Sequence, residues 1–162
     1  MLIRIIAVGQ RSPKWVNEAV ADYIKRFPKE IRVELVTVKT ETRTGDPSRK
    51  TEAATATPTA REAQRLREKF PARARVVVLD EHGDDLRTTA LAQRLQRWQR
   101  AADPVAILIG GPDGLDPGLK AEAAERIRLS SLTLPHALAR VLLSEQLYRA
   151  WSINAGHPYH RE

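Results

Sequence analysis

The chain has 162 residues, of which 42% are hydrophobic and 29% are charged, and these proportions predict a single globular domain over residues 1–162. It contains no cysteine, which excludes disulfide bonds, thiolate metal sites and cysteine nucleophiles. The 27 lysine and arginine residues outnumber the 20 acidic residues, and the net charge of +7 favours a polyanionic partner such as nucleic acid over a basic surface that only binds solvent.

Membrane insertion and export leave no signal in the sequence. No apolar run approaches the roughly 20 residues that a membrane span needs. The first residues, MLIRIIAVGQ, lack a basic leader and a small-residue cleavage site. We therefore expect no membrane contact and a cytoplasmic location.

The first forty residues predict a strand, a helix and a second strand. Residues 2–9 are β-branched and apolar, as in a buried strand. Residues 13–27 have helical periodicity, and residues 32–39 alternate like a strand near the edge of a sheet. The spacing of four residues in the helix predicts a core stripe, rather than a platform for stacking bases, made of Trp15, Ala19, Tyr23 and Phe27.

Residues 40–59 are rich in threonine, lysine, arginine, glycine and proline and predict a loop leading into a weak helix. The helix is expected over residues 60–70, where Pro71 ends it. A basic cluster in and beside the loop could contact phosphates or could simply be solvated, and the sequence does not separate these alternatives. The cluster consists of Lys39, Arg43, Arg49 and Lys50.

The second half of the chain predicts two central strands, over residues 75–80 and 105–111, because both are continuous apolar runs. Helices are expected over residues 88–100, after Asp116, and over residues 136–153. The last of these has apolar residues on more than one stripe and should be buried on two sides. Residues 129–134, LSSLTL, predict a final short strand. Regular alternation of strands and helices favours an α/β sandwich with a mostly parallel sheet.

Ligands in such folds bind beyond the carboxyl ends of the central strands. Three segments follow the predicted strands there: residues 79–83, 110–114 and 133–136. The glycines of GGPDG could let a ligand approach the backbone or could form a tight turn before the next helix. The segment matches neither the P-loop nor the dinucleotide-binding pattern.

The carboxyl-terminal tail also carries candidate functional side chains. Tyr159 could stack on a base and Arg161 could pair with a phosphate, unless the tail is simply a disordered end. Glu145 and Arg149 have the spacing of an ion pair within a helix, but Arg149 could instead face a ligand. Four histidines occur, yet a tail interrupted by proline is a poor scaffold for ligands, so we expect no metal.

Several long motifs occur in order along the chain: AVGQRSPKWV, DYIKRFPKE, GPDGL, LSSLTLPHALARVLLSEQLYRAWSI and HPYHRE. With these motifs the chain resembles the ribosomal RNA large-subunit methyltransferase H family of the SPOUT superfamily, and the resemblance covers nearly its whole length. The weakest match is over residues 40–58, where this sequence is rich in threonine and alanine and the family usually carries a more basic helix.

The resemblance implies a SPOUT-type α/β/α sandwich with a C-terminal trefoil knot, which general topology rules treat as exceptional. It also implies a homodimer that uses S-adenosylmethionine to methylate N3 of a pseudouridine, in helix 69 of the 23S rRNA of the assembled ribosome. The expected donor-binding residues, carried over by position, are Leu79, Gly110, Gly111, Leu129, Ser130, Ser131, Leu132, Thr133 and Leu134.

The acceptor N3 must lose a proton before it attacks. We expect Arg149, Arg161 or both to stabilise the resulting anion, His160 to accept or relay the proton, and Tyr159 to contact the base. The tail could serve the donor of the partner protomer. Two other functions fit parts of the sequence: a nucleotide-phosphate-binding α/β enzyme that uses GGPDG, and an RNA- or ribosome-binding factor without catalysis.

Overall fold

The computed structural model describes residues 1–41 and 56–161. Within them a parallel sheet has the strand order β2-β1-β4-β3-β5. The expected mostly parallel sheet is confirmed, and β2 lies at its edge as the alternating pattern predicted. The strands are β1 (Leu2–Val8), β2 (Arg32–Val38), β3 (Arg75–Asp85), β4 (Val105–Ile109) and β5 (Glu125–Arg128).

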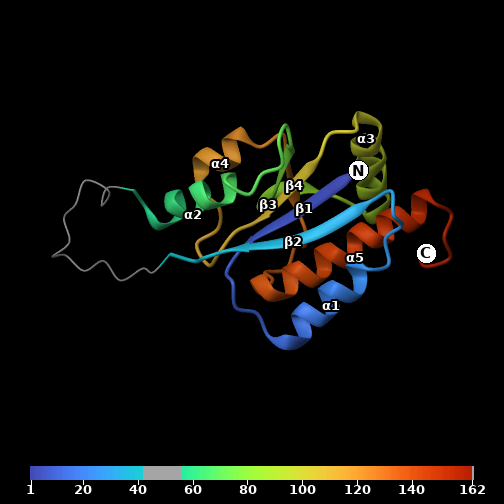
Figure 1. Ribbon diagram of the computed structural model, residues 1–162, viewed down its shortest axis with the longest axis horizontal. Helices are drawn as coiled ribbons and strands as arrows, with labels where there is room; N and C mark the ends of the chain where they lie inside the picture. The colour runs from blue at the N-terminus through green and yellow to red at the C-terminus, as the bar shows by residue number, and fades with distance from the viewer. Residues whose placement is uncertain (42–55, 162) are drawn as a thin grey trace.

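Helices cover both faces of this sheet (Figure 1). Helices α1, α3 and α5 pack on one face, and α2 and α4 on the other. Two buried clusters result: one contains Ile5, Leu95 and Leu147, and the other contains Leu66 and Leu119. The α/β/α sandwich is therefore confirmed. The helices are α1 (Lys14–Ile24), α2 (Pro58–Arg67), α3 (Thr88–Ala101), α4 (Pro117–Glu122) and α5 (His136–Asn154).

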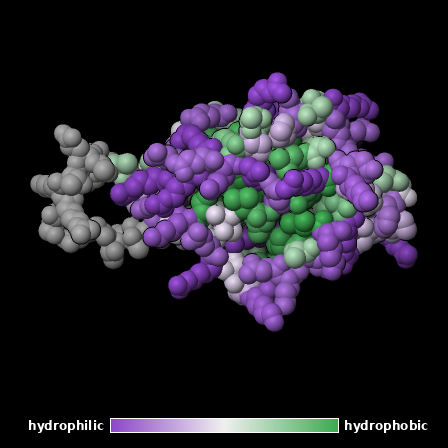
Figure 2. Space-filling view, viewed as in Figure 1, coloured by the Kyte–Doolittle hydropathy of each residue, from purple (hydrophilic) through white to green (hydrophobic). Residues whose placement is uncertain are grey.

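The central strands are apolar because the sheet is covered on both sides. Every residue of β4 is buried, and so are Ile3, Ile5 and Ile6 of β1. Figure 2 shows hydrophobic residues gathered in the middle of the visible face, with hydrophilic residues around them. Among the described residues, no helix combines the length and apolar character needed to cross a bilayer.

In helix α1 the buried stripe differs from the predicted one. Val16 and Val20 are the buried residues of this helix, whereas Trp15 is 54% exposed. The buried face therefore lies one residue further along the chain than the aromatic spacing suggested. Tyr23 and Phe27 are half-buried, and Phe27 packs edge-on against Tyr148 of α5, with ring centroids 5.6 Å apart.

The last strand is not where the sequence placed it. Strand β5 covers Glu125–Arg128 and pairs with β3, while residues 129–134 form a loop. Its sequence, ERIR, contains one apolar side chain, Ile127. One is sufficient because an edge strand buries little surface. Because charged residues flank Ile127 on both sides, the sequence lacks the apolar pattern by which a strand is predicted.

Helix α5 extends over the residues predicted for it and contacts both α1 and α3, which confirms burial on two sides. The C-terminal trefoil knot stays a prediction. Of the predicted basic cluster, Lys39 is exposed, and Arg43, Arg49 and Lys50 lie outside the described residues.

Candidate functional site

A cavity of about 830 Å³ opens at the carboxyl ends of the strands. Three segments far apart in the sequence line it: residues 79–82 after the first half of β3, residues 109–115 after β4, and residues 128–134 after β5. His136 and Ala139 of α5 complete the wall. The cavity therefore lies where the parallel sheet predicted a ligand, and it gathers every residue expected to bind the donor.

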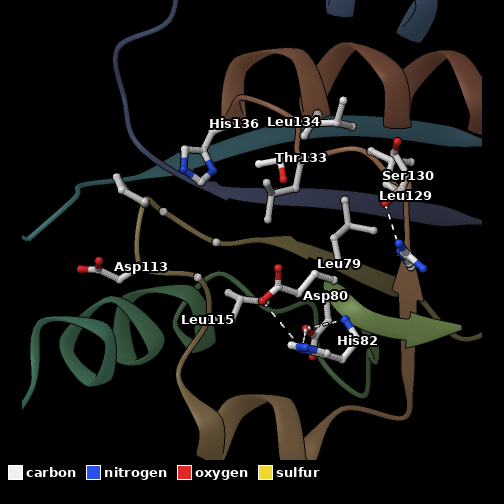
Figure 3. A pocket seen from close by; sticks show the side chains of 18 of the residues that line it. Leu79, Asp80, His82, Asp113, Leu115, Leu129, Ser130, Thr133, Leu134 and His136 are labelled. Carbon is white, nitrogen blue, oxygen red and sulfur yellow. Dashed lines mark hydrogen bonds and ion pairs between the residues drawn. The ribbon is translucent and has the colours of Figure 1, made fainter.

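Apolar side chains occupy the middle of this cavity. Leu79 of β3 and Leu129 and Leu134 of the loop after β5 lie around one space, with Thr133 beside them (Figure 3). Leu132, by contrast, is 75% exposed. Leu132 therefore adds apolar surface at the rim of the cavity.

The glycine segment is a tight turn that also lines the cavity. The N–H of Gly114 donates to the carbonyl of Gly111 over 2.9 Å, and Gly114 has a φ of +76°. A Cβ atom on Gly110 would lie 2.7 Å from the carbonyl carbon of Gly114, which no side chain tolerates. The tight turn expected from the sequence is therefore confirmed, and its residues line the cavity; the approach of a ligand to its backbone stays a prediction.

The loop of residues 129–134 is held by hydrogen bonds to its own backbone. Arg128 donates from Nε to the carbonyl of Ser130 (3.2 Å) and from Nη2 to the carbonyl of Ser131 (3.4 Å). The hydroxyl of Ser130 accepts from the N–H of Leu132 over 2.9 Å. These bonds fix the loop so that its leucines and small polar residues present a shaped edge to the cavity.

Asp80 places a carboxylate in the cavity wall. Its side chain is 4% exposed, and its oxygens lie 3.4 Å from Lys120 Nζ and 3.2 Å from the backbone nitrogen of His82. Burial raises the pKa of Asp80, but the His82 N–H and Lys120 outweigh burial, so this pKa lies below its usual value. Asp80 is therefore ionised at neutral pH and is paired with Lys120 in the cavity wall.

Arg140 fixes the start of α5 against the end of β1. Its Nη2 donates to the carbonyls of Val8 (3.0 Å) and Gly9 (2.6 Å), and its Nη1 donates to the Ser12 hydroxyl (2.6 Å). Burial lowers the pKa of this guanidinium. The contacts tie the helix that closes the cavity to the central sheet, which holds the adjoining loop in register.

The expected catalytic residues gather at the other end of α5. Arg149 donates from Nε (2.8 Å) and Nη2 (2.6 Å) to Glu145 Oε1, and the Tyr159 hydroxyl donates to the same oxygen over 3.0 Å. The guanidinium carbon of Arg149 lies 4.8 Å from the centre of the Tyr159 ring. The predicted ion pair thus exists, and Glu145 orients both Arg149 and Tyr159.

The rest of the tail packs beside this cluster. His160 is half-buried, and both of its ring nitrogens are buried without a hydrogen-bond partner among the described residues. Arg161 is exposed. Within residues 1–41 and 56–161, no three histidine or acidic side chains lie close enough to hold a metal ion. The tail therefore presents a polar cluster whose histidine lacks a partner within these residues.

The two sets of expected site residues are separated within one chain. His136 lines the cavity, and Arg149 lies thirteen residues further along the same helix, which corresponds to about 20 Å of helix axis. Figure 1 shows α5 running back from the carboxyl ends of the strands towards their amino ends, where the chain finishes. None of Arg149, Tyr159, His160 and Arg161 lines the cavity.

Sequence reasoning missed several residues of the wall, and Lys120 is one of them. Lys120 comes from α4, whose sequence carries no motif, and it reaches Asp80 only because α4 folds back beside β3. The neighbouring residues Asp80, His82 and Asp113 were located at strand ends from the sequence, although no role was assigned to them. A lone lysine in a charged helix gives no signal that would single it out.

Comparisons with known proteins add family relationships to this geometry. The family model described as "Predicted SPOUT methyltransferase" matches residues 1–160. A protein of Acidovorax sp. (strain JS42) called "Ribosomal RNA large subunit methyltransferase H" is 59% identical over 162 residues, which are 100% of both chains. A protein of the same name from Ralstonia nicotianae is 52% identical over 161 residues, which are 99% of both chains.

Solved structures share the fold at low sequence identity. A probable methyltransferase of Bordetella pertussis Tohama I aligns with a TM-score of 0.55 and 21% identity, over 91% of this chain and 95% of that one. A probable methylase family protein of Haemophilus influenzae Rd KW20 aligns with a TM-score of 0.55 and 14% identity, over 99% of this chain and 70% of that one. These two likenesses support the fold.

Proposed function

Because the chain belongs to the SPOUT methyltransferase family, we propose that it methylates N3 of a pseudouridine in helix 69 of 23S rRNA, within the assembled ribosome. The methyl donor is S-adenosylmethionine. The observation that carries the proposal is the single cavity at three adjacent strand ends, lined by all the residues expected to bind this donor. The basic charge of the chain supports an RNA substrate.

The cavity residues fit the chemistry of this donor. Leu79, Leu129 and Leu134 could enclose the faces of its adenine, while backbone groups of the loop 129–134 and of the glycine turn bind the polar edge. The ionised Asp80 lines the same cavity and would favour a cationic group in it. When bound, the donor supplies an already activated methyl group, so the protein mainly has to align the acceptor.

The tail cluster would act on the acceptor base. Deprotonation of N3 leaves negative charge on the base oxygens, which Arg149 and Arg161 would stabilise. His160, whose ring nitrogens have no partner among the described residues, would accept or relay the proton. Tyr159, held by Glu145, would position the base. A guanidinium paired with a carboxylate keeps a fixed orientation, as this role requires.

The geometry favours an active site shared between two protomers of a homodimer. The tail of one chain lies about 20 Å of helix away from its own cavity. In an isologous dimer, however, the tail of one protomer can face the cavity of the other. Trp15 and Leu132, the large hydrophobic side chains exposed among the described residues, mark apolar surface that a partner would cover.

Transfer of a labelled methyl group to ribosomes tests the function. We expect one methyl group per ribosome, mapped by mass spectrometry to N3 of a helix 69 pseudouridine. Calorimetry with S-adenosylmethionine separates the alternatives: a nucleotide-phosphate enzyme would instead bind nucleoside phosphates with magnesium. Donor binding without any transfer to ribosomes would contradict the proposed substrate.

Mixed dimers test the shared site. One protomer carries Thr133→Arg, which fills the cavity from its exposed rim, and the other carries His160→Ala with Arg161→Ala in the tail. The shared site predicts that each mixed dimer has one intact site and therefore about half of the activity of a wild-type dimer, although each homodimer is inactive. An inactive mixture, with both proteins folded and dimeric, would show that each tail serves its own chain.

A further inference from the structure

A second cavity, of about 490 Å³, lies between β3, β5 and α3. We call it the arginine groove, because four arginines line it together with His82, against two carboxylates, Asp84 and Glu125. Neither the family resemblance nor the donor chemistry accounts for it. The four arginines are Arg75, Arg94, Arg97 and Arg126.

Arg94 and Glu125 form the base of the groove, whereas the side chain of Asp84 is 65% exposed. Glu125 accepts from Arg94 Nη1 over 3.0 Å and from Trp98 Nε1 over 2.8 Å, and Arg75 Nη1 lies 3.5 Å from it. Arg94 also donates to Asp84. Because Arg94 and Glu125 are nearly buried, these contacts form a fixed floor and not a solvated surface pair.

Two arginines of the groove are not paired with the carboxylates of its floor. Arg97 of α3 and Arg126 of β5 are exposed, and neither forms an ion pair with any residue that the structure describes. The rim of the groove is therefore positive, while its floor is neutralised. Guanidinium groups arranged in this way suit the oxygens of a phosphodiester, which accept paired N–H donors.

The arginine groove adjoins the donor cavity. His82 lines both cavities, so one surface leads from the strand ends to Arg97 and Arg126. Gly83 allows β3 to lie close to β5 at this junction, since a Cβ atom there would lie 2.7 Å from the backbone nitrogen of Ile127. The groove and the donor cavity thus hold fixed positions on two sides of the bulge in β3.

We propose that the arginine groove binds the phosphodiester backbone of the RNA strand whose nucleotide is methylated in the adjoining cavity. The proposal rests on the proposed RNA substrate and adds to it a docking site with Arg97 and Arg126 as the phosphate-contacting residues. Such contacts supply affinity and register without reading sequence. They also release counterions, so they must appear in the salt dependence of binding.

The test compares Arg97→Ala/Arg126→Ala with Arg100→Ala. Arg100 lies on the same helix as Arg97 and is also exposed, but it lines neither cavity. Binding to ribosomes is measured by sedimentation over a series of salt concentrations, independently of methyl transfer. The double variant should bind about 10-fold more weakly at low salt, and its log–log salt slope should be smaller by about 2, because two phosphate contacts are removed. Donor affinity and the thermal midpoint should match the wild type.

The outcomes separate this proposal from the proposed function. If the wild type transfers no methyl group but the double variant still loses affinity and salt slope, the substrate assignment fails and the arginine groove stands. If affinity changes by less than twofold with an unchanged slope, or if Arg100→Ala has the same effect as the double variant, the groove is not a phosphate site. The wild type failing to bind ribosomes at low salt would also overturn it.

Discussion

The two ends of α5 differ in the residues that surround them and in the chemistry that these residues suit. At the cavity end, backbone turns and leucines shape a space, and the ion pair of Asp80 with Lys120 lies in its wall. At the tail end, Glu145, Arg149 and Tyr159 form a polar cluster against aromatic rings, with Tyr148 and Tyr159 4.8 Å apart. The first arrangement suits recognition of a small molecule, and the second suits stabilisation of charge during a reaction.

This difference predicts that substitutions at the two ends change different measured quantities. Changes at the cavity end should alter donor affinity, because the backbone itself forms the binding surface. Changes at the tail end should alter the rate of transfer at saturating donor, because in the proposed function the tail acts on the acceptor base. Donor calorimetry and single-turnover methylation measure the two quantities separately.

The largest effect is expected for Gly110→Ala. Its Cβ atom would collide with the carbonyl carbon of Gly114, so the turn must move and the donor affinity should fall about 100-fold. Gly156→Ala is the control at the tail end. Gly156 has a φ of +64° but open space around it, so this variant should lose about 1 kcal/mol of stability at unchanged donor affinity.

Equal donor affinity in Gly110→Ala and the wild type would show that the glycine turn does not shape the donor site. Thermal unfolding of both variants distinguishes a local change from a general loss of structure.

The next largest effect is expected for Arg149→Lys. A lysine keeps the charge but cannot donate two N–H bonds to Glu145 from a planar group, so its position over Tyr159 is lost. Single-turnover methylation should slow by about 100-fold while donor affinity stays within twofold. Arg26→Lys, which alters an arginine packed near Tyr148, should leave the rate unchanged. A parallel loss of donor affinity in Arg149→Lys would contradict the division between the two ends.

The cavity end could be predicted from the sequence because its signals are local. Continuous apolar runs identified β3 and β4, and parallel strands bring their carboxyl ends together regardless of the details. The glycines of the turn follow β4 directly. Even so, β5 escaped detection because Ile127 is its one buried residue, and the strand was placed in the loop that follows it.

The tail end could not be predicted to the same extent. The spacing of Glu145 and Arg149 predicted their ion pair, since four residues make one helical turn. That Tyr159 folds back onto the same carboxylate depends on a turn near Gly156, which no periodicity encodes. The exposure of Trp15 was missed for a related reason: a spacing of four fits two neighbouring faces of a helix, and packing selects one of them.

A smaller effect is expected for Tyr159→Phe. Removing the hydroxyl leaves Glu145 with Arg149 and Gln146, so transfer should slow about 10-fold and stability should fall by about 1 kcal/mol. Burial, Tyr23 and the Glu145 carboxylate raise the pKa of Tyr159 above its ordinary value. Its hydroxyl therefore stays protonated in alkaline buffer, and the wild-type rate should show no falling limb near pH 10 from this group. A fall in the wild-type rate near pH 10 that is absent in Tyr159→Phe would contradict this prediction.

The smallest effect is expected for Asp80→Asn at the cavity wall. The folded-state pKa of Asp80 lies below its unfolded value, so its contribution to stability is complete above the unfolded pKa and disappears as pH falls through the folded one. The variant should be less stable than the wild type by about 1 kcal/mol near pH 7, and the two should converge in acid. Urea unfolding at a series of pH values measures this difference.

Lys120→Met provides the matched variant, because it removes the ion pair from the other side. If the pair matters through the charge of the wall, Asp80→Asn should weaken donor binding a fewfold while Lys120→Met strengthens it, since removing the lysine leaves the carboxylate more negative. If both substitutions weaken donor binding equally, the pair acts by holding α4 against β3 and not by its charge.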